Sequence, residues 1–176
     1  MDSEHAGQSE IAPAPHSNAV FLDMNPTNAE ASSPLPENAE ALMRDFATAT
    51  GADGVTLWRA EEDALVAIAN PLEPSIVGLR QPLDRGLISR VYLTGQAILE
   101  QMLQENPVHD RSIDSSMGTR GTAMMAAPLE ADEGDDGGVV SAVLLEHHQG
   151  PADFSLQGLE QLTALARALS SGWTRP

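Results

Sequence analysis

Apolar residues recur at helical spacing in two segments of this chain, one near residue 40 and one near the C-terminal end of the sequence. In residues 38–50 they follow one another every three or four positions, which predicts an amphipathic helix that ends at Gly51. The same spacing follows Ser155, a residue suited to cap a helix, and continues to Trp173. Because its apolar residues spread over two sides, this second helix is expected to bury more than one surface.

The middle of the chain predicts a shorter helix and a long polar segment. Asp84 is expected to cap a helix that runs through Thr94, with Gly95 as its stop. Residues 105–120 are rich in Asp, Ser, Pro and Gly, which is typical of a long excursion that includes a helical turn.

Short apolar runs between the helices predict a sheet. Residues 55–59 and 64–69 flank an acidic turn and indicate one hairpin, whereas 123–129 and 139–147 flank a glycine-rich and acidic segment and indicate another. Residues 97–102 alternate weakly and suggest a further strand. Few helices lie between these strands, so the order favours an α+β fold with an antiparallel sheet covered by helices rather than a doubly wound parallel sheet.

Length and composition predict one domain with an N-terminal tail. Residues 1–36 contain mostly Ala, Pro, Ser, Asn, Glu and Gln, a composition typical of a disordered arm. Residues 37–176 then suffice for one domain with its own core.

Charge and residue usage exclude several classes of function. With 26 acidic residues and a net charge of −17, the chain would be repelled by nucleic acid and by anionic membrane surfaces. No membrane-spanning run or secretory signal is apparent, which predicts a cytoplasmic protein. The absence of cysteine excludes disulfides, thiolate metal sites and a cysteine nucleophile.

Several motifs resemble the GAF domain family. The run GLRQPLDRGLISRV at residues 78–91, with TGQA at 94–97, is similar to the central signature of that family. The loop at 106–120, the strands at 124–129 and 138–146, and the last helix are similar to the family's later elements, in the same order. The resemblance covers roughly residues 38–173.

This resemblance implies a PAS-like α+β fold with a central antiparallel sheet of about six strands. The first and last helices would cover one face, and a segment from about residue 76 to 120 would roof a ligand pocket on the other. Homology of position suggests that the pocket is lined by Trp58, Tyr92, Arg111, Thr119, Arg120 and Met124.

The resemblance also suggests what the chain lacks. The lysine motif of cyclic-nucleotide members is absent, and Arg80, Arg85, Arg111 and Arg120 are expected mainly to form surface ion pairs rather than to bind an anion. Members that reduce methionine sulfoxide use cysteines, which this chain does not have.

No catalytic, metal or cofactor site is predicted. His109 is interpreted as an exposed loop residue rather than a haem ligand. His147 and His148 are adjacent and should point to opposite faces, so they are not expected to chelate one metal. The acidic run at 132–137 lacks the spacing of a calcium loop and is interpreted as a hairpin tip.

Two functions remain open, and an enzyme is a distant third. In the first, a non-catalytic sensory domain binds a small molecule and, because the sequence ends soon after the last helix, passes the signal to a partner protein. In the second, a ligand-free interaction module forms a homodimer through its first and last helices. The residues expected at that interface are Leu42, Phe46, Leu159, Leu162, Leu169 and Trp173.

Overall fold

The computed structural model describes residues 35–130, 137–150 and 153–171. Residues 1–34 of the predicted arm, the tip of the second hairpin and Trp173 therefore lie outside the described residues.

The described residues form a six-stranded antiparallel sheet with the order β3-β2-β1-β6-β5-β4. Both predicted hairpins and the extra strand are confirmed, and so is the α+β class. The strand β3 was not predicted, because three residues are too few to show an alternating pattern. The strands are β1 (Gly54–Ala60), β2 (Ala64–Ala69), β3 (Arg80–Pro82), β4 (Ile98–Glu100), β5 (Gly121–Leu129) and β6 (Gly138–Leu145).

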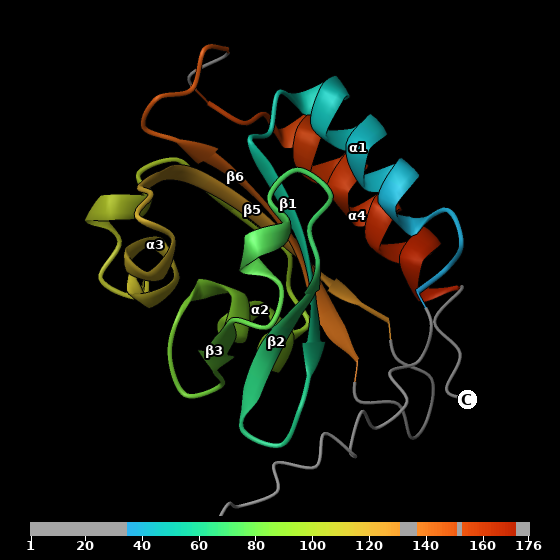
Figure 1. The fold of residues 1–176 in the computed structure, drawn as a ribbon, viewed down its shortest axis with the longest axis horizontal. Helices are drawn as coiled ribbons and strands as arrows, with labels where there is room; N and C mark the ends of the chain where they lie inside the picture. The colour runs from blue at the N-terminus through green and yellow to red at the C-terminus, as the bar shows by residue number, and fades with distance from the viewer. Residues whose placement is uncertain (1–34, 131–136, 151–152, 172–176) are drawn as a thin grey trace, which may run out of the picture. The chain divides into compact units, whose positions relative to one another are not determined.

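Two layers cover the sheet, one on each face (Figure 1). The long helices α1 (Ala39–Thr50) and α4 (Leu156–Ser170) lie side by side on one face. The other face carries α2 (Leu87–Thr94), α3 (Ser112–Met117) and the short 3-10 turns η1 (Pro74–Ile76) and η2 (Leu103–Glu105). Among the described residues, no helix is long and apolar enough to cross a membrane.

The central strands bury side chains on both faces. Successive residues of a strand point to opposite sides of the sheet, so one strand can serve two layers. In β1, Val55 and Leu57 join the core beneath α1 and α4, whereas Trp58 joins a second cluster with Ile88 and Val91 of α2. This two-sided burial explains why most residues of the runs at 55–59 and 139–147 are apolar, rather than every second one.

The helix ends confirm one predicted cap and correct another. The Ser155 hydroxyl accepts a hydrogen bond from the Gly158 amide at 3.0 Å, as expected for the start of α4. Asp84, in contrast, does not cap α2: the residue at that position is Gly86, with a φ of 92°. The backbone angle favours glycine there, and a Cβ at this position would lie 2.7 Å from Nε2 of Gln81 and displace that amide.

The proposed dimer residues are largely used inside the chain. Phe46 is 7 % exposed, and Leu162 and Leu169 are fully buried between α4 and the sheet, so these three leave little surface for a second chain. Leu42 and Leu159 are partly buried at the edge of the same core. Homodimerisation stays a prediction, but it would have to use residues other than these three.

Burial of Leu162 leads to a stability prediction. Leu162→Ala should lower the free energy of unfolding by about 2–5 kcal/mol, because it removes buried contacts and leaves a cavity. Leu156→Ala, on the same helix but 72 % exposed, should change it by less than about 0.5 kcal/mol. Urea unfolding followed by circular dichroism measures both, and equal effects would contradict the assigned packing of α4.

Candidate functional site

A cavity of about 160 Å³ lies between the sheet and the segment that covers its second face. Its floor is formed by residues of β1, β5 and β6, including Thr56, Met124 and Ser141. Its cover comes from the loop after β2, from α2 and from α3 with the residues around it. The cavity thus occupies the place expected for a ligand pocket in this fold.

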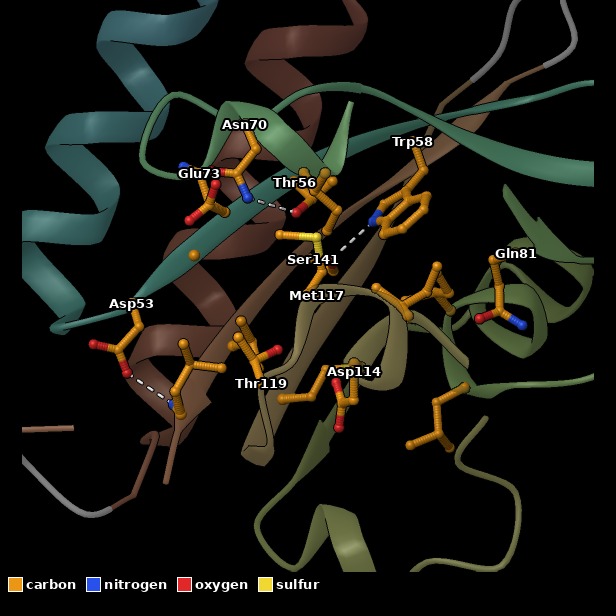
Figure 2. A pocket seen from close by; sticks show the side chains of 18 of the residues that line it. Asp53, Thr56, Trp58, Asn70, Glu73, Gln81, Asp114, Met117, Thr119 and Ser141 are labelled. Carbon is orange, nitrogen blue, oxygen red and sulfur yellow. Dashed lines mark hydrogen bonds between the residues drawn. The ribbon is translucent and has the colours of Figure 1, made fainter. Parts of the chain in front are cut away.

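The polar groups of the floor are held by side-chain hydrogen bonds between neighbouring elements. Figure 2 shows Trp58 and Ser141 joined across β1 and β6, where the indole Nε1 donates to the Ser141 hydroxyl at 2.9 Å. The Asn70 amide donates to the Thr56 hydroxyl at 3.0 Å. These bonds fix the orientation of the indole ring and of both hydroxyl oxygens on the floor.

Asn70 also starts the loop that covers the cavity. Its side-chain oxygen accepts from the amides of Leu72 and Glu73 at 3.0 and 2.9 Å, which bends the chain directly after β2. Because Asn70 is 5 % exposed and bonds Thr56 at the same time, it ties the floor to the cover.

Asp114 of α3 fastens the other part of the cover. One carboxylate oxygen accepts from the Gly121 amide at 3.1 Å and from Gln104 Nε2 at 3.0 Å. Nε2 of His109 lies 3.3 Å from the same oxygen. These contacts connect α3 to the start of β5 and to η2.

The environment of Asp114 keeps it ionised. Burial by itself raises the pKa of this carboxyl, but the hydrogen bonds from His109, the Gly121 amide and Gln104 outweigh burial, so its pKa lies below the ordinary value. Asp110 behaves alike: burial raises its pKa, whereas bonds from Ser112 and Gln81 and the charge of Arg85 lower it overall. Both side chains are therefore carboxylates at neutral pH.

Three of the six residues expected at the pocket line the cavity. They are Trp58, Thr119 and Met124. Tyr92 packs instead against the second core cluster. Arg111 donates to Gln104, and Arg120 pairs with Glu146 on the surface. Contact of any of these residues with a ligand stays a prediction.

The arginines of the covering segment form contacts with other parts of the chain. Arg80 pairs with Glu61 and Asp63, and Arg85 pairs with Asp110. Together with Arg120, they confirm the predicted surface ion pairs, whereas Arg111 bonds an uncharged partner. No arginine is among the described residues that line the cavity.

His109 was wrongly predicted to be exposed. Its side chain is 5 % exposed, and the residue lines the cavity beside Asp114. The polar sequence around it suggested a solvated loop, but short-range hydrogen bonds fold that loop over the imidazole. His148 lies beyond β6, with Nδ1 2.9 Å from Asp53. Within the described residues no group of three or more His, Cys, Asp or Glu side chains could hold a metal ion.

The sequence model of the GAF domain matches residues 34–172. The chain belongs to the GAF domain family. GAF domains are generally sensory or regulatory ligand-binding domains, and most are not catalytic. Among curated proteins, none matches the sequence significantly.

Solved structures share the GAF fold at low sequence identity. The GAF domain of a phosphoenolpyruvate-protein phosphotransferase from Coxiella burnetii is 20 % identical, with a TM-score of 0.65 over 81 % of this chain and 83 % of that one. The free methionine-R-sulfoxide reductase of Neisseria meningitidis, solved with its substrate, is 21 % identical, with a TM-score of 0.61 over 81 % and 80 %. The GAF-B domain of DevS from Mycobacterium smegmatis is 20 % identical, with a TM-score of 0.58 over 78 % and 92 %.

Sequence reasoning missed several polar residues of the GAF pocket. Thr56 and Ser141 stand inside otherwise apolar strand runs, and a buried polar residue in such a run was a signal available from the sequence. Gln81, Asn70 and Asp114 gave no such signal, because they lie in segments that are polar anyway.

The depressed pKa of Asp114 predicts a pH-dependent contribution to stability. A carboxyl whose pKa is lower in the folded state stabilises the fold above its unfolded pKa, and this contribution disappears as the pH falls through the folded pKa. Asp114→Asn should therefore unfold at lower urea concentration than the natural protein at pH 7, and the difference should shrink towards pH 3.

Asp45→Asn, at an exposed position of α1, is the matched control and should change stability by less than about 0.5 kcal/mol. An Asp114→Asn difference that stays constant from pH 7 to pH 3 would contradict the role of the ionised carboxylate.

Proposed function

We propose that this GAF domain is a non-catalytic sensory or regulatory domain that binds a small molecule in the cavity and relays binding to a partner protein. The observation that carries the proposal is the cavity of about 160 Å³, which has a polar floor and sits beneath a cover of loops and short helices. A pure interaction module would instead be expected to fill this space with side chains.

The architecture supports a route for the signal. The cover is tied to the floor by Asn70 and to β5 by Asp114, so a ligand that touches both layers would favour the closed arrangement of the cover. The same strands contact α1 and α4 through their opposite face. A ligand-dependent shift of those two helices would then be available to a partner.

The reductase activity named for the Neisseria structure is not part of the proposal. At such low identity the likeness supports the fold alone, and this chain contains no cysteine for thiol chemistry.

Native mass spectrometry of the protein isolated from its natural cells tests ligand binding. We expect a non-covalent adduct that is released on denaturation. Thr119→Tyr adds a ring at an exposed position of the cavity lining and should abolish the adduct, whereas Thr48→Tyr, exposed on α1, should retain it.

The proposal would be contradicted if the isolated protein carries no adduct and no small metabolite raises its melting temperature. An adduct that survives Thr119→Tyr would place the binding site elsewhere and contradict the assignment of this cavity.

A further inference from the structure

Two hydroxyl groups stand side by side on the cavity floor. Thr56 and Ser141 are direct partners in the pairing of β1 with β6, so their side chains leave the same face of the sheet. For such pairs the Cβ atoms are about 5 Å apart. Thr56 is 4 % and Ser141 7 % exposed, and both residues line the cavity.

Each hydroxyl accepts a hydrogen bond but donates none within the described residues. Ser141 accepts from the Trp58 indole and Thr56 from the Asn70 amide, as the dashed lines in Figure 2 mark. Because both partners are N–H donors, the proton of each hydroxyl is left for another acceptor. A buried O–H group without an acceptor is unfavourable, so these protons favour a ligand atom that accepts hydrogen bonds.

Gln81 offers the complementary group on another wall of the cavity. The residue is 2 % exposed, and its Nε2 donates to the Arg85 carbonyl and to Asp110. Its carboxamide oxygen accepts no bond from a described residue, and Figure 2 shows this oxygen turned towards the cavity. It is therefore an acceptor for a ligand N–H group.

The charge of the lining disfavours an anion. Four carboxyl residues line the cavity, namely Asp53, Glu73, Asp110 and Asp114, and the only basic side chain in the described lining is His109. A phosphate or carboxylate group would be repelled by this surrounding charge. The remaining lining is largely aliphatic, and Ile76, Ile88 and Ile113 provide contact for an apolar body.

We infer that the ligand is an uncharged, largely apolar molecule that carries a carbonyl acceptor and an N–H donor, as in an amide or lactam. Thr56 and Ser141 donate to its carbonyl oxygen, and Gln81 accepts from its N–H. This assignment of ligand class rests on the proposed small-molecule function.

Three probe molecules of similar size differ in the groups that the proposal assigns to the ligand. Benzamide carries the carbonyl and N–H groups, benzoate replaces them with an anion, and toluene has neither. Titration of the nitrogen-15-labelled protein, followed by amide NMR, should show benzamide shifting the signals of the floor strands. Benzoate should bind at least about tenfold more weakly, because its charge faces the carboxylates.

Variants of Thr56 test the donated hydrogen bond. Thr56→Val removes the hydroxyl at nearly constant shape and should weaken benzamide binding about threefold to tenfold. Thr56→Ser keeps the hydroxyl and should restore the affinity. Toluene should bind the natural protein and Thr56→Val equally, which distinguishes a lost hydrogen bond from a collapsed cavity.

The outcomes distinguish the ligand class from the function itself. Benzoate binding as tightly as benzamide, or benzamide affinity unchanged by Thr56→Val, would overturn the ligand class and leave the binding function standing. If none of the three probes binds but another small molecule does, the ligand class is likewise overturned and the binding function still stands. If no small molecule of any class binds, the proposed function fails as well.

Discussion

The burial of the central strands on both faces is the constraint on which the rest of the structure depends. In β1 and β6, one set of alternating side chains packs beneath α1 and α4, and the other set faces α2 or the cavity. Val55 and Leu57 belong to the first set, whereas Thr56 and Trp58 belong to the second. A shift of one residue in the pairing of these strands would place hydroxyls in the aliphatic core and aliphatic groups on the cavity floor.

The cover of the cavity is held differently from the sheet. Few apolar side chains of α3 are available for packing, and the helix is only six residues long, so its position depends on hydrogen bonds. Asp114 and Asn70 each bond several groups from different elements. Such a layer can exchange individual hydrogen bonds without losing the hydrophobic core, a property suited to a segment that responds to a ligand.

The sequence predicted the hydrophobic framework better than the polar cover. Periodicity located α1, α4 and both hairpins, because burial of their apolar residues leaves a repeating pattern. It could not locate β3, the cap at Gly86 or the burial of His109, because none of them leaves a repeating apolar pattern: β3 has three residues, Gly86 acts through its backbone angle, and His109 is buried by a polar loop. Resemblance to the GAF family predicted where the cavity lies. Of the six residues that it suggested for the lining, three line the cavity.

The hydrogen bond between Trp58 and Ser141 lies on the cavity side of β1 and β6, one residue away from side chains that belong to the core on the other side. Both residues project from strands whose neighbouring positions, Leu57 and Val140, are completely buried beneath the long helices. Substitutions of the hydroxyl residues Thr56 and Ser141 would change the cavity floor while the opposite side of the strands keeps its aliphatic packing. In this architecture the polar lining of the cavity and the packing beneath the long helices can therefore evolve as nearly separate properties.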